Sequence, residues 1–155
     1  MKRICILSDT HGFLRDEVKT ELAQSDLILH AGDIDNRDLF QTLRGFGELY
    51  AVRGNNDRCL PELPVTRSLS VEGVRFFIVH NIKDIPRDLT DTDIVVYGHT
   101  HQYYSAVSDG ILFLNPGSCG KRRFHYELTY CRMVIEKDAY RYDKIVINKT
   151  EMRCR

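Results

Sequence analysis

Short apolar runs alternate with amphipathic stretches in the first half of the chain. The runs at 3–7, 26–30 and 49–52 have the length and the β-branched content of buried strands. Apolar side chains recur at four-residue spacing from Leu14, and helical spacing returns beyond Asn36, a good helix N-cap. This repeat of strand, polar loop and helix favours a parallel α/β core.

The second half of the chain shows the pattern of β-hairpins. Apolar runs flank the turn signals Glu72-Gly73 and Asp109-Gly110, and two further runs flank residues 137–139. The predicted strands of this half are 68–71, 74–79, 93–97, 105–107, 111–114, 129–135 and 141–147. We therefore predict an α/β fold in which two β-sheets pack face to face in a sandwich flanked by α-helices, a four-layer αββα arrangement.

Length and composition indicate one folded domain over residues 1–155. The chain is 43% hydrophobic and 28% charged, which is ordinary for a globular protein. It has no apolar run near the ~20 residues that a membrane span needs. The N-terminus reaches Asp9 too early for a signal peptide. We expect a cytoplasmic protein with no membrane partner.

Cysteine and charge patterns exclude several classes of protein. The five cysteines form no Cys-x-x-Cys pair, which argues against a zinc knuckle or a disulfide framework and favours free thiols in a reducing compartment. The 22 basic and 22 acidic side chains balance overall, although residues 121–155 hold 10 basic and 5 acidic ones. This surplus is too small and too scattered to predict a nucleic-acid partner.

Polar residues gather directly after five of the apolar runs. If these loops share the carboxyl edge of the sheets, they bring together two aspartates, one asparagine and four histidines. The candidates are Asp9, His11, Asp33, Asn55, His80, His99 and His101. Such mixed oxygen and nitrogen ligands suit Mn²⁺, Fe or Zn²⁺ better than Ca²⁺ or Mg²⁺. Each motif alone is weak, and the prediction of a metal site rests on the complete set.

The same motifs resemble those of a known family. Asp9-Thr10-His11, Gly32-Asp33, Gly54-Asn55-Asn56-Asp57, His80 and Gly98-His99-Thr100-His101 are similar to the motif set of the calcineurin-like metallophosphoesterases. The resemblance covers nearly the whole chain. The short length, Asn115-Pro116-Gly117-Ser118 and the two closing strands are similar to the small YfcE-type phosphodiesterases.

The resemblance implies two divalent metal ions per subunit. Mn²⁺ is the first choice, with Fe, Zn and Ni as alternatives. Carried over by motif, one ion is held by Asp9, His11 and His101, the other by Asn55, His80 and His99, and Asp33 bridges them. The implied activity is that of a dinuclear metal-dependent phosphoesterase, a phosphodiesterase that hydrolyses small phosphodiesters through a metal-bridging hydroxide. In this scheme no side chain is the nucleophile.

Two positions depart from the family pattern. Asn56 stands where most members have a histidine that is thought to protonate the leaving group or to steady the phosphate. An asparagine can donate a hydrogen bond but cannot act as an acid, so we assign Asn56 to substrate binding and expect modest turnover with good leaving groups. Asn81 follows His80 where glycine is usual, which alters the loop but not the ligand.

Two other functions have this fold. The retromer scaffold subunit is a protein-binding platform that has lost critical ligands, so a weak or inactive scaffold is the alternative. All seven ligand positions are retained here, which favours the enzyme. DNA-processing nucleases of the superfamily carry capping domains for which 155 residues leave no room.

The remaining polar and aromatic residues receive weaker assignments. We expect His30 to be a hydrogen-bonding residue at a strand end, His125 to have little role, and residues 121–123 to be a solvated charge run. Ser118 and Cys119 have no evident base for nucleophilic chemistry. A homo-oligomer could bury Tyr130, Met133, Tyr140 and Tyr142, but packing into the core is the default for these residues.

Overall fold

The computed structural model describes residues 1–120 and 127–147. One five-stranded sheet, sheet A, has the order β10-β9-β1-β2-β3. Its strands are β1 (Lys2–Leu7), β2 (Leu27–His30), β3 (Glu48–Ala51), β9 (Thr129–Glu136) and β10 (Ala139–Val146). β1, β2 and β3 are mutually parallel, and β9 joins β1 in antiparallel pairing. Three parallel strands therefore end at the same edge, as the first half of the sequence predicts.

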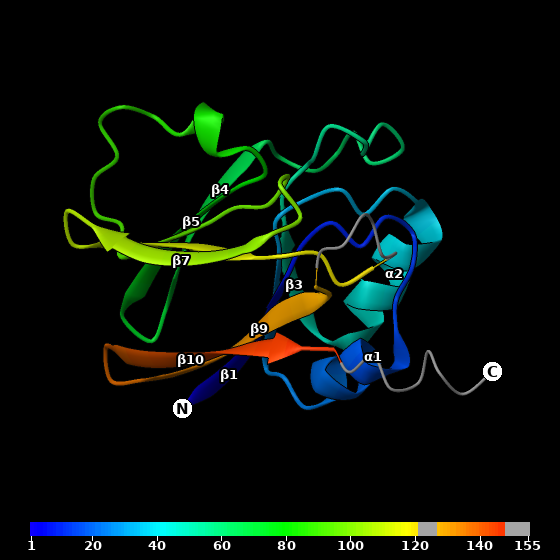
Figure 1. The fold of residues 1–155 in the computed structure, drawn as a ribbon, viewed down its shortest axis with the longest axis horizontal. Helices are drawn as coiled ribbons and strands as arrows, with labels where there is room; N and C mark the ends of the chain where they lie inside the picture. The colour runs from blue at the N-terminus through cyan, green and yellow to red at the C-terminus, as the bar shows by residue number, and fades with distance from the viewer. Residues whose placement is uncertain (121–126, 148–155) are drawn as a thin grey trace.

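The second five-stranded sheet, sheet B, has the order β4-β5-β6-β8-β7. Its strands are β4 (Thr66–Val71), β5 (Val74–Val79), β6 (Ile94–Val96), β7 (Tyr103–Ser108) and β8 (Ile111–Pro116). β5, β6 and β8 are parallel, while β4 and β7 are antiparallel edge strands that arise from the predicted hairpins. The two sheets lie as separate layers in Figure 1.

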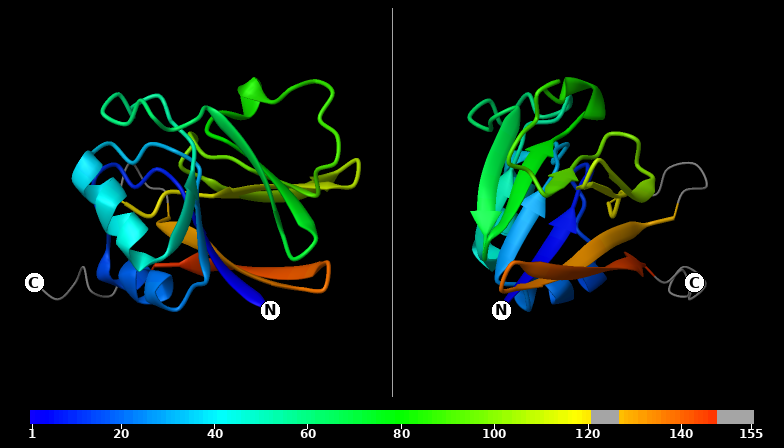
Figure 2. Two further views of the ribbon diagram at one scale, coloured as in Figure 1. Left: turned by 180° about the vertical axis from the view of Figure 1, so that it is seen from behind. Right: turned by 90° about the vertical axis from the view of Figure 1, so that its left-hand side faces the viewer.

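The two α-helices cover one side of the sandwich. α1 (Asp16–Ala23) and α2 (Arg37–Phe46) pack on the face of sheet A that is turned away from sheet B (Figure 2). Asn36 caps α2, since its Oδ1 accepts a hydrogen bond from the N–H of Leu39 at 2.7 Å. The alternation within β1 serves both layers: Ile4 and Ile6 lie in the core between the sheets, and the residues between them face the helices.

The predicted sandwich is confirmed, and its outer layer over sheet B consists of a short turn and a loop. Over the free face of sheet B, the described residues supply a 3₁₀ turn, η1 (Ile82–Asp84), and a loop, whose Ile82, Ile85 and Leu89 pack against the strands. Pro86 interrupts this stretch and cannot continue a helix, which explains why a loop forms the layer.

The large side chains of the closing hairpin pack into or against the core, as the sequence analysis expects by default. Met133 lies between the sheets and Tyr130 lies under the helices, both buried. Tyr140 and Tyr142 pack against the core between the sheets. His125 and residues 121–123 lie outside the described residues. In the described part of the chain no helix has the length and apolar character to cross a membrane.

A partly buried ion pair joins α1 to sheet A. Glu21, which is 4% exposed, accepts hydrogen bonds from Arg132 on β9 at 2.7 and 3.0 Å and from the hydroxyl of Tyr130 at 3.2 Å. Burial raises the pKa of Glu21, but the hydrogen bonds and charge of Arg132 outweigh it, so the pKa lies below its ordinary value of 4.5. Glu21 is therefore ionised in the folded protein at neutral pH.

Glu21→Gln should lower the free energy of unfolding at pH 7 by about 2 kcal/mol, because Arg132 loses its charged partner. A carboxylate with a lowered pKa stabilises the fold fully above its unfolded value and loses that contribution as the pH falls through its folded value. The difference between wild type and variant should therefore shrink below about pH 4.5. Urea unfolding across this pH range measures it.

Asp16→Asn is the matched control, since it lies on the same helix with its side chain 98% exposed. We expect it to change stability by less than about 0.5 kcal/mol. Equal losses in the two variants would show that the ion pair does not hold the helix to the sheet.

Candidate metal centre

The predicted site residues lie in loops at the carboxyl ends of parallel strands in both sheets. Backbone hydrogen bonds join these loops in pairs: the N–H of Asp9 donates to Gly32 O at 2.9 Å, and that of His11 to Asp33 O at 3.0 Å. In sheet B, the N–H of Gly98 donates to His80 O at 2.9 Å. The loops therefore form one connected rim.

Most of the predicted ligands have an unusual backbone conformation. Five of the seven have a positive φ, between 48° and 77°: Asp9, His11, Asp33, His99 and His101. A left-handed conformation costs a non-glycine residue on the order of 1 kcal/mol or more and persists only where the surroundings enforce it. Such strain concentrates at functional sites.

The carboxylate of Asp9 lies at the centre of the cluster with one oxygen unpaired. Oδ2 accepts hydrogen bonds from Ser8 Oγ at 2.6 Å and from the N–H of His99 at 3.0 Å. Oδ1 is buried and has no hydrogen-bond partner among the described residues. An unsatisfied buried carboxylate oxygen is costly, and a bound cation would remove this cost.

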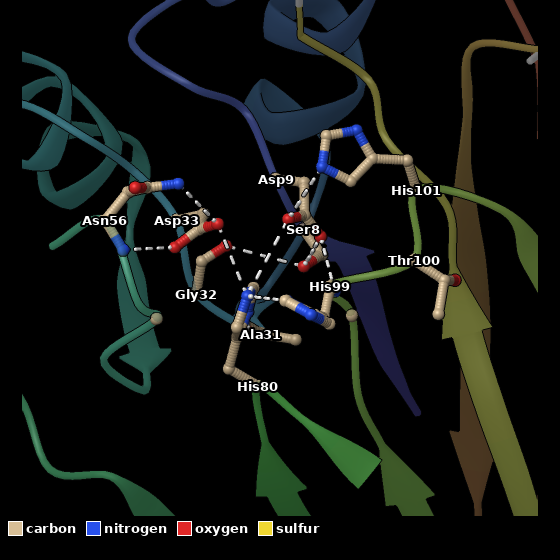
Figure 3. Close-up of polar contacts among 12 residues, drawn as sticks. Ser8, Asp9, Ala31, Gly32, Asp33, Asn56, His80, His99, Thr100 and His101 are labelled. Carbon is tan, nitrogen blue, oxygen red and sulfur yellow. Dashed lines mark hydrogen bonds and ion pairs between the residues drawn. The ribbon is translucent and has the colours of Figure 1, made fainter. Parts of the chain in front are cut away.

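Three imidazole nitrogens surround this oxygen. The distances from Asp9 Oδ1 are 3.4 Å to His101 Nε2, 3.6 Å to His11 Nε2 and 3.9 Å to His80 Nε2. Figure 3 shows Asp9, His80, His99 and His101 converging with Asp33 on one centre. Two groups with metal-ligand spacing therefore include Asp9: Asp9 with His11 and His101, and Asp9 with Asp33 and His80.

The histidines form two pairs whose nitrogens face each other. His11 Nε2 lies 3.2 Å from His101 Nε2, and His99 Nδ1 lies 3.3 Å from His80 Nε2. Two such nitrogens attract only if one of them carries a proton, because two lone pairs repel. Two neutral imidazoles that share a cation satisfy the same geometry. The pairs match the two predicted ligand sets.

Hydrogen bonds behind the imidazoles fix their orientation. His80 Nδ1 lies 2.7 Å from Ala31 O and must donate to it, so Nε2 is the nitrogen that faces the centre. His11 Nδ1 lies 2.8 Å from Asp35 Oδ2. Carbonyl and carboxylate partners of this kind are typical of metal-binding histidines.

Asp33 occupies the position between the two histidine pairs. Its Oδ2 lies 3.3 Å from His80 Nε2 and 3.8 Å from His11 Nε2, one imidazole from each pair. The neighbouring Asn56 donates its N–H to Asp33 Oδ1 at 2.9 Å and its side-chain amide to Oδ2 at 3.2 Å. Asn56 therefore positions the central carboxylate, a contact that the sequence did not predict.

The pKa shifts report a strongly negative site. Burial raises the pKa of Asp9, but the contacts of its carboxylate with His101 and His11 lower it much further, to well below the usual range. Burial lowers the pKa of His80, but the contacts with Asp33 and Asp9 raise it to about 9. The carboxylates thus draw positive charge into the centre.

Asn55 is exposed and lines a surface pocket together with His80 and His99. This places the amide on the side of the second predicted ligand pair. Three other polar residues of the sequence analysis lie around the site and not in it: His30, Ser118 and Cys119.

His30 is buried at the end of β2, and its Nδ1 accepts from the N–H of Gly32 at 3.0 Å, so Nε2 donates to Thr10 Oγ1 at 3.0 Å. Burial lowers its pKa to about 4. The prediction that His30 is a strand-end hydrogen-bonding residue is confirmed. Ser118 Oγ donates to Asp9 O at 2.9 Å, and burial raises the pKa of Cys119 to about 12, so neither is activated as a nucleophile.

Asp57 has a structural role that sequence reasoning missed. Its two carboxylate oxygens accept hydrogen bonds from the N–H groups of Asp33, Ile34, Asp35 and Gly54, at 2.8 to 2.9 Å. Asp33, Asp35 and Asp57 also have metal-ligand spacing, but Asp57 is committed to the backbone. Its position at the end of Gly54-Asn55-Asn56-Asp57 was the available signal.

Two glycines leave space for the central carboxylates. A Cβ on Gly54 would lie 2.2 Å from Asp33 Oδ1, and one on Gly98 would lie 2.6 Å from Asp9 Oδ2 and 2.1 Å from Ser8 Oγ. Only glycine allows this approach of backbone to carboxylate, which explains the Gly-Asn and Gly-His steps of the motifs.

The geometry agrees with comparisons to known proteins. A model of the calcineurin-like phosphoesterase superfamily domain matches residues 1–138. The chain belongs to this superfamily. A probable metallophosphoesterase of Bacillus subtilis is 31% identical over 150 residues, which are 88% of this chain and 86% of that relative. One from Methanocaldococcus jannaschii is 29% identical over 130 residues, 74% of this chain and 67% of that protein.

Solved structures of the calcineurin-like phosphoesterase fold align over almost the whole chain. A novel archaeal phosphodiesterase aligns with a TM-score of 0.73 at 25% identity, covering 94% of this chain and 99% of that one. Vps29 of Chaetomium thermophilum aligns with a TM-score of 0.77 at 15% identity, covering 96% and 100%. The latter similarity is one of fold alone.

Asp57→Asn should loosen the loops that carry Asp33 and Asn55, because an amide oxygen replaces only one of the two accepting oxygens. We expect a loss of about 2 kcal/mol in the free energy of unfolding and at least about tenfold weaker Mn²⁺ binding. Urea unfolding and isothermal titration measure the two effects. Asp38→Asn, an exposed carboxylate on α2, is the control, and Mn²⁺ binding equal in both variants would contradict this role.

Proposed function

We propose that this chain is a metal-dependent phosphodiesterase that holds two divalent cations and hydrolyses small phosphodiesters. The observation that carries the proposal is the buried, unpaired Oδ1 of Asp9, which three imidazole nitrogens face beside Asp33. Carboxylate and imidazole groups in this arrangement fit a divalent transition metal. A phosphodiesterase of Methanocaldococcus jannaschii, 27% identical over 139 residues, supports the reaction class.

The two histidine pairs suggest how the cations would be shared. Asp9, His11 and His101 would hold one cation, and Asn55, His80 and His99 the other. Asp33, which lies within 4 Å of one imidazole from each pair, would contact both. When bound, two such cations supply a hydroxide nucleophile at neutral pH and positive charge for the phosphoryl oxygens. Mn²⁺ is our first choice of metal.

The chain's own residues orient this centre. Ala31 O fixes the tautomer of His80, Asp35 orients His11, and Asn56 holds Asp33 in place. Asn56 is also the residue we propose to contact the substrate, as a hydrogen-bond donor with no acidic proton to give. A leaving group must therefore depart with little proton transfer from the protein, which favours activated esters.

Two further expectations belong to the proposal. We place the protein in the cytoplasm, because the cysteines of the described residues are free and three of them are buried. We also treat residues 1–155 as one domain. The family match ends at residue 138, between the paired strands β9 and β10 of the closing hairpin, and a domain boundary there would separate them.

Asp33→Ala should abolish metal loading and activity together, because the residue between the two ligand sets is lost. The test strips the protein of metal, refills it with Mn²⁺, and measures bound metal and hydrolysis of bis(4-nitrophenyl) phosphate. We expect kcat/KM to fall by at least about 10²-fold. Asp88→Ala, an exposed carboxylate on the loop over sheet B, is the control.

Full activity in Asp33→Ala would refute the dinuclear site. Metal binding by the wild type without turnover on several phosphoesters would instead favour a scaffold that binds protein partners.

Asn56→His should leave the metals in place, because the backbone N–H of residue 56 still donates to Asp33 Oδ1. It should raise the rate on poor leaving groups by about tenfold or more, since an imidazole can supply general acid catalysis. Rates for aryl phosphodiesters of graded leaving-group pKa measure the effect. Asn56→Ala, which removes the amide without adding an acid, should show no such gain. A gain of equal size in both variants would exclude proton transfer as its cause.

A further inference from the structure

A polar pocket adjoins the predicted second metal position. The predicted ligands Asn55, His80 and His99 form part of its wall together with Gly54. The rest is lined by Arg53, Val65, Asn81 and Asp84. The predicted metal ligands account for only part of this lining, so the pocket offers a binding surface that the hydrolytic centre does not use. This location suits the part of a substrate that extends from the phosphoryl group.

Arg53 lies two residues beyond the end of β3. Its N–H donates to Pro64 O at 2.7 Å, and the preceding Val52 is fully buried. The guanidinium makes one long contact, from Nη1 to Pro61 O at 3.5 Å. Among the described residues no carboxylate lies within salt-bridge distance of Arg53, whereas Arg37, Arg75 and Arg132 each have such a partner.

Asn81 adds a second donor to the lining of the pocket. Its Oδ1 accepts a hydrogen bond from the N–H of Lys83 at 3.0 Å, which begins the turn η1 and fixes the side chain. The side-chain amide N–H groups have no partner in the described parts of the chain and can donate to a ligand. A guanidinium and an amide that both offer donors are suited to an oxyanion.

We infer that this pocket, through Arg53, recognises a second anionic group on the substrate. The substrate class is a phosphodiester with a carboxylate or phosphate on one of its ester groups. This inference rests on the proposed function, since it places the scissile phosphoryl group at the metal centre. Asp84 opposes simple anions in the same pocket, so selectivity depends on a group that reaches the guanidinium.

Two phosphonates that cannot be hydrolysed and differ only in a carboxylate provide the test. Ethylphosphonate supplies the phosphoryl group alone, and 2-carboxyethylphosphonate adds the anion. Isothermal titration of each into the Mn²⁺-loaded protein gives a ratio of dissociation constants. We expect the wild type to bind the carboxylated compound about tenfold more tightly, as one charge-assisted pair of this exposure allows.

Three variants assign that ratio to the pocket. Arg53→Gln should bring it to about one, and Asp84→Asn should raise it by about two- to threefold, because the local repulsion is removed. Arg87→Gln is the matched control: it removes the same charge from an exposed loop position outside the pocket, and the ratio should stay at the wild-type value.

The outcomes separate this inference from the proposed function. Failure of ethylphosphonate to bind the Mn²⁺-loaded wild type would count against the metal centre itself. Binding of both phosphonates with a ratio near one, or a ratio that Arg53→Gln leaves unchanged, would overturn the role of Arg53 while leaving the metal centre intact.

Discussion

The unpaired Oδ1 of Asp9 is the constraint on which the site depends. A buried carboxylate oxygen without a donor costs free energy that the fold alone does not recover. The chain nevertheless fixes it there: Ser8 and the backbone of His99 occupy the other oxygen, and Gly98 has no Cβ to displace it. The backbone at Asp9 and His99 is also strained, with φ of 55° and 77°. The unpaired oxygen of Asp9 therefore lowers the stability of the fold and favours a cation at this centre.

The sandwich of two sheets brings the loops of this site together. Parallel strands in both sheets end at one rim, so loops from distant parts of the sequence meet without a long insertion. Asp57 then joins the loops after β2 and β3 by accepting four backbone N–H groups. The buried part of β1, with Ile4 and Ile6 on one face and Cys5 and Leu7 on the other, provides the rigid base beneath.

Local sequence patterns predicted the helices and strands better than they predicted the contacts between them. The four-residue apolar spacing, the cap at Asn36 and the Asp109-Gly110 turn are local signals, and the structure bears them out, except that α1 begins at Asp16 and leaves Leu14 before the helix. That β9 pairs with β1, which begins the chain, depends on contacts between residues more than a hundred positions apart, and no local signal specifies it. The αββα prediction put helices on both outer faces, whereas a turn and a loop cover sheet B. Here Pro86, which cannot continue a helix, is a local signal for the loop.

The site shows the same division between side-chain chemistry and loop geometry. Residue type identified the carboxylates and imidazoles, because few other side chains bind metals. The role of Asp57 acts through backbone N–H groups. Residue type alone cannot distinguish it from the role of an ordinary turn aspartate. Asn56 is the instructive case. In the sequence, asparagine in place of a histidine looks like the loss of a functional group. In the structure, its side-chain amide donates a hydrogen bond to Asp33, which an imidazole would have to replace. At position 56 the chain therefore has a side chain that positions a carboxylate.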